Sequence, residues 1–354
     1  MTVKVLIPTS SAGMETGIGR YCAQVLNAFD RTGLRVEKEY LKHHLIAIGR
    51  RELGYYVKFA LYAMQFRMTP RARIRGEVVH SFNAMIVPPD TDVVTMWDLI
   101  PFHRALRRVV RRPPLYSIIL RMAERNLLEY PRFFVTISET VRHEMHEYYE
   151  LPLDRIRVAR PAADLELFRP IKDPTVPFSS DKLNLLHVGT AVPRKNIRGI
   201  VEALGQLGPG RFRLVRVGPP TDPSCVEEYT RRARALGLEI LEIGYAPYES
   251  LPEYYSAADL VLFPSTAEGA GIPPLEAMAC GTNVVVSDLP VHREMCGEAA
   301  IYCGTDPASI AQAIDRGLSS PIPSEILRAQ VSSWTWDDVA RVYIRIYEEV
   351  LRGS

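Results

Sequence analysis

The feature that most constrains the fold of this 354-residue chain is an alternation of short apolar segments with longer segments of mixed polarity. The apolar segments have the length of β-strands, and the segments between them have the length and periodicity of helices. The strand candidates are Val3–Pro8, Glu77–His80, Val93–Met96, Phe133–Ile137, Leu183–Val188, Phe212–Val217, Leu238–Ile243, Leu260–Pro264 and Asn283–Ser287. The helix candidates include Tyr21–Phe29, Asn196–Gly205, Cys225–Leu236 and Pro274–Cys280. This alternation predicts an α/β fold with parallel, doubly wound sheets.

A break in this pattern divides the chain into two halves. The segment Phe168–Asp181 contains three prolines and little periodicity, which is typical of a linker. Because the chain is too long for one ordinary core, we predict Rossmann-like domains at residues 1–170 and 171–335. An amphipathic helix over Trp336–Leu351 follows the second domain. Ligands of such sheets bind at the carboxyl ends of the strands, so we expect the site in a cleft between the domains.

Charge is distributed unevenly between the halves. Residues 1–170 carry 26 Lys and Arg against 18 Asp and Glu, whereas the rest of the chain is acidic. Two basic segments that also contain apolar residues, Lys58–Arg75 and His103–Arg125, stand out. This excess predicts an anionic partner, either a phosphorylated lipid-linked acceptor or an anionic membrane surface. Nucleic acid is not expected, because no recognised binding motif accompanies the charge.

The location is predicted from what the sequence lacks. No apolar run reaches the roughly 18–20 residues that span a bilayer, and the N-terminus has no cleavable signal pattern. The five cysteines form an odd set without a C-x-x-C pair, which favours reduced, buried thiols over disulfides or a zinc site. We therefore expect a cytoplasmic protein, which the basic segments place at the inner face of the membrane.

Two loops that follow strands carry groups suited to anions. The first, Gly13–Arg20, contains Gly17 and Gly19 before a helix, but Cys22 replaces the third glycine of a dinucleotide fingerprint. The second, Gly189–Asn196, contains the adjacent cations Arg194 and Lys195, and Asn196 is a candidate helix N-cap. Taken alone, the first loop could be a plain tight turn and the second a charged loop without a ligand.

The segment Phe263–Gly281 is more informative. It places Glu268, a glycine-containing turn and then Glu276 at the start of a helix, directly after a buried strand. Carboxylates accept hydrogen bonds from the vicinal hydroxyls of sugars. Backbone N–H groups between the two acids suit phosphate oxygens.

At this point the sequence resembles a known family. Glu268-x7-Glu276, with Gly269, Gly271 and Pro273 inside it, is similar to the signature of retaining family-four glycosyltransferases of the group 1 type. Other matches in order are Gly17–Gly19, Pro193–Asn196, Leu251-x3-Tyr255, Arg293–Glu294 and the helix that begins at Trp336. The resemblance implies the GT-B fold, in which two Rossmann-like domains face each other across a cleft. It also implies that the C-terminal helix crosses back to the N-terminal domain.

The resemblance also implies roles for individual residues. Lys195, helped by Arg194, would neutralise the donor diphosphate, Glu268 would bind the donor sugar, and Glu276 would hold the ribose. Tyr245 would lie against the base, and Gly17 and Gly19 would close the site from the other domain. The implied catalytic set is Glu268, Lys195 and Arg194. The implied donor-binding set is Gly17, Gly19, Trp97, Asp98, Gly189, Thr190, Tyr245, Gly269, Ala270, Gly271, Ile272 and Glu276.

Two positions depart from the family pattern. Thr190 stands where an arginine is frequent, so one cation is missing or is replaced by Arg194. Trp97 stands where a histidine commonly touches the donor sugar, in Met96-Trp97-Asp98. An indole offers one hydrogen-bond donor and a face for stacking. We therefore expect a donor sugar, or an orientation of it, that differs from those of histidine-bearing relatives.

The predicted activity is transfer of a sugar from a nucleoside-diphosphate sugar to an acceptor hydroxyl, with the anomeric configuration retained. The acceptor would be a sugar, a polysaccharide or a lipid-linked glycan. Because no Asp-x-Asp motif lies in a suitable loop, we expect no metal and no other cofactor. Three alternatives stay open at this stage: a nucleotide-sugar 2-epimerase-like isomerase, a non-catalytic nucleotide-sugar binding protein, and a nicotinamide oxidoreductase, which the incomplete glycine fingerprint disfavours.

Overall fold

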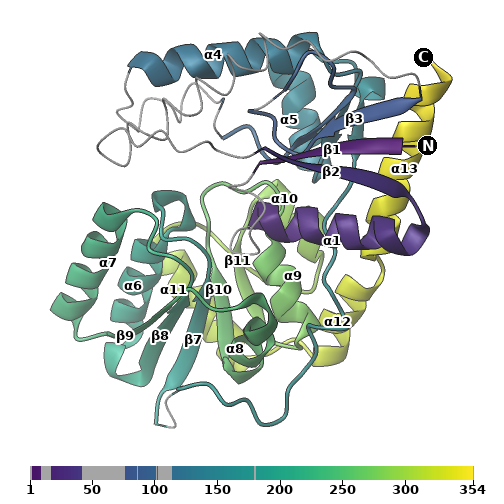
Figure 1. The fold of residues 1–354 in the computed structure, drawn as a ribbon. Helices are drawn as coiled ribbons and strands as arrows, with labels where there is room; N and C mark the ends of the chain where they lie inside the picture. Colours follow the sequence, from purple (N-terminus) through teal and green to yellow (C-terminus); the bar gives the residue numbers. More distant parts are fainter. Residues whose placement is uncertain are drawn as a thin grey trace. The chain divides into compact units, whose positions relative to one another are not determined.

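The computed structural model describes residues 2–8, 17–41, 76–85, 87–100, 102, 114–178 and 181–353. It divides into two compact units, and each is an α/β domain built on one parallel sheet (Figure 1). Unit 1 comprises Met1–Pro161 and Trp336–Ser354, and unit 2 comprises Ala162–Thr335. The predicted α/β fold with two Rossmann-like sheets is therefore confirmed.

The proline-rich segment expected to join the domains is part of unit 2 as far as it is described. Its first residue, Phe168, is fully buried. Its ring lies edge-on to Tyr248 and Tyr255, with centroid distances of 5.2 and 6.0 Å. Burial of this aromatic ring attaches the start of the segment to unit 2. The sequence-based boundary at residue 170 therefore falls inside that unit.

The sheet of unit 1 has the strand order β2-β1-β3-β4-β5-β6 among the described residues, and neighbouring strands pair in parallel. Its strands are β1 (Thr2–Pro8), β2 (Arg35–Leu41), β3 (Glu77–Ser81), β4 (Val93–Met96), β5 (Phe133–Thr136) and β6 (Ile156–Val158). Strands β2 and β6 were not expected from the sequence. Both lie at edges of the described sheet, where short or charged strands are tolerated because one side is unpaired.

The helices of unit 1 include the C-terminal helix, so the expected return of the chain end to the first domain is confirmed. They are α1 (Gly17–Thr32), α4 (Pro114–Glu129), α5 (Glu139–Tyr149) and α13 (Trp336–Arg352). The hydroxyl of Tyr347 lies 2.7 Å from His80 Nδ1, and that of Tyr343 lies 3.0 Å from Thr95 Oγ1. These buried polar contacts fix the rotation of α13 against strands β3 and β4.

The sheet of unit 2 has the order β12-β11-β10-β7-β8-β9, again with parallel pairing. Its strands are β7 (Leu183–Val188), β8 (Phe212–Val217), β9 (Glu239–Gly244), β10 (Leu260–Phe263), β11 (Val284–Ser287) and β12 (Ile301–Cys303). The chain order reverses between β7 and β10, which are neighbours in the sheet. In a doubly wound sheet this switch point is where ligands bind, outside the carboxyl ends of the strands.

Helices cover both faces of this second sheet (Figure 1). They are α6 (Ile197–Leu207), α7 (Pro223–Leu236), α8 (Leu251–Ala257), α9 (Ile272–Ala279), α10 (Pro290–Cys296), α11 (Pro307–Ser319) and α12 (Ser324–Ser332). The core between α6, α7, α11 and the strands is apolar and includes Leu204, Leu214 and Ile314, all fully buried. A packed core of this kind holds the strand ends rigidly, and the loops at the switch point are built on those ends.

Several sequence-based features lie outside the described residues or are described only in part. Lys58–Arg75 is outside them, as are the first loop from Gly13 to Thr16 and the part of His103–Arg125 before Pro114. All five cysteines are described, and each is a buried free thiol, as expected. No helix among the described residues is long and apolar enough to cross a membrane.

Candidate functional site

The loops that follow β7 and β10 meet at the switch point of unit 2. The amide of Thr266 donates to the carbonyl of Arg194 at 2.8 Å, which joins the two loops through their backbones. Asn196 was expected to cap α6, but it has φ 55°, and its side chain makes no capping hydrogen bond. Instead, its Nδ2 donates to the carbonyls of Pro264 (3.2 Å) and Thr305 (2.8 Å). Asn196 therefore stabilises the meeting of the loops rather than the helix start.

Three charged side chains from these loops form one cluster. Lys195 Nζ lies 2.6 Å from Glu268 Oε1, and Arg194 Nη1 lies 2.8 Å from the same oxygen. The side chains of Lys195 and Glu268 are each 8% exposed, whereas that of Arg194 is 34% exposed. The structure thus brings together the three residues expected to be catalytic. Two cations and one carboxylate leave one positive charge, which suits an anionic ligand.

The cluster also determines the ionisation of Glu268. Burial raises the pKa of this carboxyl, but Lys195 and Arg194 outweigh burial, and the pKa is lowered to about 2. Glu268 is therefore a carboxylate at neutral pH, able to accept hydrogen bonds but unable to donate a proton. This state suits binding of sugar hydroxyls or cations and does not suit a general acid.

Phe263, the last residue of β10, packs against the charge cluster through Lys195. Lys195 Nζ lies 4.2 Å from the centroid of its ring, within the range of a cation–π contact. The rings of His187 and His292 lie beside it, with centroid distances of 6.2 and 5.7 Å. Burial lowers the pKa of His187 to about 3 and also lowers the pKa of His292. Both imidazoles are therefore neutral at pH 7 and add no charge to the cluster.

The second acid of the motif, Glu276, lies on α9 and is fully buried. The hydroxyl of Tyr255 donates to its Oε2 at 2.7 Å. Tyr255 thus fixes one oxygen of the carboxylate expected to hold the ribose, and no role in the site had been assigned to it. Its position in the motif Leu251-x3-Tyr255 was the available signal.

The glycine-containing turn between the acids has fewer donors than its position suggests. Gly271 has φ 83° and is the N-cap of α9, where no side chain caps the helix. Pro273 and Pro274 occupy the first turn and have no N–H group, so two of the usual terminal donors are missing. The donors expected for phosphate or sugar are therefore the backbone amides of the turn itself, at Gly269, Ala270, Gly271 and Ile272.

The remaining predicted residues of unit 2 lie at the carboxyl ends of the neighbouring strands. Gly189 and Thr190 directly follow β7, and Tyr245 directly follows β9. The side chain of Tyr245 is 52% exposed, which is unusual among the large hydrophobic residues that the structure describes. An exposed aromatic at this edge of the sheet is available for stacking. The base-binding role of Tyr245 remains a prediction.

The other predicted residues, Gly17, Gly19, Trp97 and Asp98, belong to unit 1. Gly17 and Gly19 occupy the first turn of α1, and Gly19 is buried. Trp97 Nε1 donates to the carbonyl of Phe82 at 2.8 Å, and its ring lies edge-on to Tyr21 at 5.0 Å. The single N–H of the indole is thus engaged within unit 1. What Trp97 can offer a sugar is a ring surface rather than a hydrogen bond.

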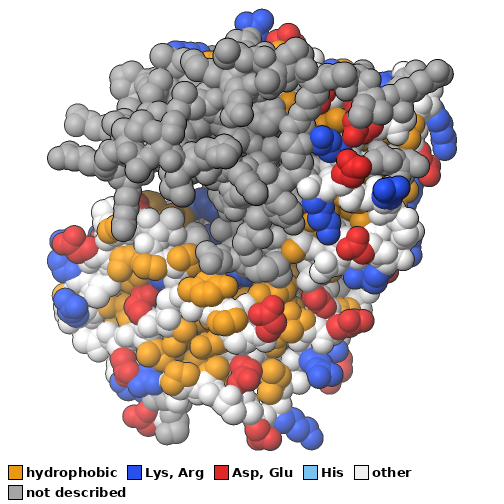
Figure 2. Space-filling view, viewed as in Figure 1, with side chains coloured by type: hydrophobic (Ala, Val, Ile, Leu, Met, Phe, Trp, Pro, Cys, Tyr) orange, Lys and Arg blue, Asp and Glu red, His pale blue; other side chains and the backbone are white. Residues whose placement is uncertain are grey.

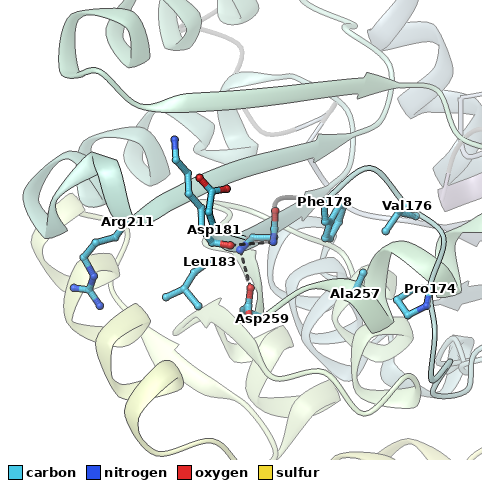
Figure 3. A pocket seen from close by; sticks show the side chains of 10 residues that line it. Pro174, Val176, Phe178, Asp181, Leu183, Arg211, Ala257 and Asp259 are labelled. Carbon is cyan, nitrogen blue, oxygen red and sulfur yellow. Dashed lines mark hydrogen bonds between the residues drawn. The ribbon is translucent and has the colours of Figure 1, made fainter.

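A hollow in unit 2, lined by residues of the segment before β7, lies away from this cluster. It has a volume of about 750 Å³ and lies at the amino ends of β7, β8 and β10, next to Leu183, Arg211 and Asp259 (Figure 3). The amide of Asn184 donates to Asp259 at 2.7 Å, so this acid is already paired. Hydrophobic side chains also gather on the face of unit 2 drawn in Figure 2. The chemistry described above lies at the opposite, carboxyl ends of the strands.

Within the described parts of the chain, no group of three or more His, Cys, Asp or Glu side chains lies together in a way that could hold a metal ion. The two cations of the charge cluster are the groups placed to meet an anion there.

The sequence of unit 2 matches a known family. Residues 169–333 match the profile described as "Glycosyl transferases group 1". The O-antigen chain mannosyltransferase B of Escherichia coli is 30% identical over 248 residues, which are 65% of this chain and 64% of that protein. A D-inositol 3-phosphate glycosyltransferase of Acidothermus cellulolyticus is 31% identical over 238 residues, 61% of this chain and 53% of that protein. The chain thus spans less than two thirds of the length of these relatives.

Solved structures share the fold over the whole chain. Sucrose-phosphate synthase from Thermosynechococcus elongatus superposes with a TM-score of 0.79 at 18% identity and covers 100% of both chains. Anabaena HepE in complex with UDP and glucose gives a TM-score of 0.70 at 15% identity and covers 99% of both. The chain therefore has the two-domain GT-B architecture, and its residues 169–333 match the group 1 glycosyl transferase profile.

Proposed function

We propose that the protein is a retaining glycosyltransferase that moves a hexose from a nucleoside-diphosphate sugar to an acceptor hydroxyl. The observation that carries this proposal is the cluster of Lys195, Arg194 and Glu268 at the switch point of unit 2. Relatives named as mannosyltransferases and inositol-phosphate glycosyltransferases support the reaction class. Anabaena HepE, which shares the fold, is in complex with UDP and glucose and supports a nucleotide donor.

The chemical task is departure of a nucleoside diphosphate while positive charge develops on the sugar ring. Lys195 and Arg194 stabilise the negative charge of the leaving diphosphate, together with backbone amides of the turn before α9. Their positions are fixed before the ligand arrives, because Glu268 and Phe263 already hold the ammonium of Lys195. Preorganised charge of this type supplies the largest share of many catalytic effects.

The bond changes balance without an enzymic base. The bond from the anomeric carbon to the phosphate oxygen breaks, and a bond to the acceptor oxygen forms on the same face of the ring. The acceptor proton passes to an oxygen of the leaving diphosphate. Glu268, ionised and engaged by two cations, accepts hydrogen bonds from the sugar and does not act as the nucleophile.

The class of acceptor is proposed from the charge of the first half of the chain. Its basic excess favours an acceptor with a phosphate, such as a lipid-linked glycan, presented at an anionic membrane surface. Co-sedimentation with phosphatidylglycerol vesicles should then be strong at low salt and lost at high salt. Absence of binding at low salt would contradict the membrane contact but not the transfer reaction.

The proposed function is tested with a panel of nucleotide sugars. Thermal unfolding is followed with UDP-, GDP- and ADP-linked hexoses, because a bound donor raises stability by mass action. The donor that stabilises the protein is then incubated with mono- and disaccharides and with lipid-diphosphate-linked sugars. Donor consumption that requires an acceptor supports a transferase. Turnover without an acceptor would indicate an isomerase, and binding without turnover would indicate a binding protein.

A further inference from the structure

Among the described residues of unit 2 one arginine is fully buried, Arg216 at the carboxyl end of β8. Its Nη1 donates to the carbonyl of Gly189 at 2.9 Å, and its Nη2 donates to the carbonyl of Gly218 at 2.6 Å. Its Nε donates to Glu242 Oε2 at 2.7 Å. Burial of a guanidinium is costly unless its donors are satisfied, and here each of its three nitrogens has an acceptor. The guanidinium is therefore held in one place.

This arginine lies where the ends of three strands are locked together. Gly189 and Gly218 directly follow β7 and β8, and Gly244 is the last residue of β9; their φ values are 152°, 137° and 72°. The amide of Gly218 donates to the carbonyl of Gly244 at 2.7 Å. A Cβ at Gly218 would lie 2.1 Å from the carbonyl oxygen of Gly189, so only glycine fits. Arg216 binds the carbonyl oxygens of two of these three residues.

The hydrogen bond from Arg216 to the carbonyl of Gly189 also affects the next residue, Thr190. In a trans peptide the carbonyl and the following N–H point in opposite directions, so the N–H of Thr190 points away from Arg216. Within the part of the chain that the structure describes, this N–H donates to no acceptor. A cation on the carbonyl polarises the peptide and makes its N–H a better donor. Lys195 lies on the same loop, and its Nζ is 3.9 Å from where a Cβ of Gly189 would be.

We propose that Arg216 is a positioning residue for the diphosphate of the bound nucleotide, acting by orienting and polarising the Gly189–Thr190 peptide beside Lys195. This inference rests on the proposed function. The hydrogen bond from Arg216 to the carbonyl of Gly218 orients no ligand-binding N–H, because the next residue, Pro219, has none. Arg216 does not touch the ligand, so its effect is confined to the phosphates and does not extend to the base or ribose.

The competing explanation is that Arg216 and Glu242 are an ordinary ion pair between β8 and β9. The chain provides a matched control for this explanation. Arg213 lies on the same strand and forms an ion pair with Glu239 of the same neighbouring strand, at the opposite, amino end. Its substitution removes a similar cross-strand pair without touching the Gly189–Thr190 peptide.

The experiment compares Arg216→Met with Arg213→Met by isothermal titration of UDP, GDP and ADP and of the matching nucleosides. For the diphosphate that binds the wild type best, we expect about tenfold weaker binding in Arg216→Met, since a charge-assisted hydrogen bond is of this order. We expect unchanged nucleoside binding in both variants and unchanged diphosphate binding in Arg213→Met. Arg216→Lys keeps the charge but not the several fixed donors of the guanidinium, so its diphosphate affinity should lie between those of Arg216→Met and wild type.

Two results overturn the inference. Equal diphosphate affinity in Arg216→Met and Arg213→Met would reduce Arg216 to a structural ion pair. An equal loss of diphosphate and nucleoside affinity in Arg216→Met would show a general disturbance of unit 2. If Arg216→Met does not fold, the comparison is made with Arg216→Lys, and the same outcomes decide. A wild type that binds none of the three diphosphates would refute the proposed function as well, which separates the two failures.

Discussion

Replacement of Glu268 by glutamine should destabilise the protein in a pH-dependent way. The substitution keeps the shape of the side chain and an acceptor oxygen for Lys195, but it removes the negative charge that Lys195 and Arg194 share. Lys195, whose side chain is only 8% exposed, would then be a buried cation without a counter-charge. Removal of one partner from a buried pair typically costs about 3–5 kcal/mol.

The pKa of Glu268 gives a second estimate of this loss. The pKa falls from its usual 4.5 to about 2 in the folded chain, and each unit corresponds to about 1.4 kcal/mol, so the charged form contributes about 3 kcal/mol. Because the folded pKa is the lower one, this contribution is complete above about pH 4.5 and is lost as the pH falls toward 2. Glutamine cannot ionise. The stability difference between wild type and variant should therefore be about 3 kcal/mol at pH 7 and about 2 kcal/mol at pH 3.5.

Urea unfolding followed by far-ultraviolet circular dichroism at the two pH values measures this difference. Glu249→Gln is the matched control, because Glu249 is exposed and its loss should change stability by less than about 0.5 kcal/mol. Pyrophosphate should raise the melting temperature of Glu268→Gln more than that of wild type, since the two cations are then unopposed. A loss below about 1 kcal/mol at pH 7, or an equal loss at both pH values, would refute the reasoning.

Four further predictions concern the reaction. Lys195→Met should lower kcat/KM for the donor at least about 100-fold. The control Arg198→Met, on the exposed side of α6, should leave kcat/KM unchanged. Equal effects of the two substitutions would contradict a role of Lys195 in the site. Tyr255→Phe should raise the donor KM several-fold with little change in kcat, and the effect should vanish for a 2′-deoxyribose donor if Tyr255 acts through Glu276. Trp97→His should change the ranking of donor sugars, and an unchanged ranking would count against a role of this residue in selection. Activity should persist in EDTA, and a complete loss that Mg²⁺ restores would overturn the metal-independent mechanism.

The interior strands were predictable because burial on both faces leaves short segments that are mostly apolar. Val93–Met96, Leu183–Val188 and Phe212–Val217 have the predicted bounds in the structure. The edge strands β2 and β12 were not predicted. Arg35–Leu41 contains three consecutive charged residues, Glu37 to Glu39, and Ile301–Cys303 is only three residues long, so neither has the signal of a buried strand.

The loops of the candidate site could be predicted from the sequence, but the contacts between their side chains could not. Glu268 and Lys195 could each be chosen from their loops, yet their ion pair joins residues far apart in sequence and depends on the adjacency of β7 and β10. The sequence-based assignment gave Glu268 to the sugar and Lys195 to the diphosphate as separate tasks. The structure shows that the two side chains share one contact, so each modifies the charge of the other.

The proposed positioning residue, Arg216, could not be identified from the sequence. A charged residue within an apolar strand was visible in the sequence, and so was Glu242 in the next strand. Their pairing requires the β8–β9 register, in which Arg216 lies opposite Glu242. The contact with the Gly189 carbonyl further requires the left-handed glycine conformations at the strand ends, which a single sequence does not specify.

The most direct test of the central claim is the anomeric configuration of the product. A ¹³C-labelled nucleotide sugar with an α-linked hexose is supplied with an acceptor, and the one-bond carbon–proton coupling of the transferred residue is followed by NMR. The account predicts an α-linked product in wild type, formed only when acceptor is present, and no detectable product with Lys195→Met. A β-linked product, or donor turnover that proceeds equally without acceptor, would contradict it.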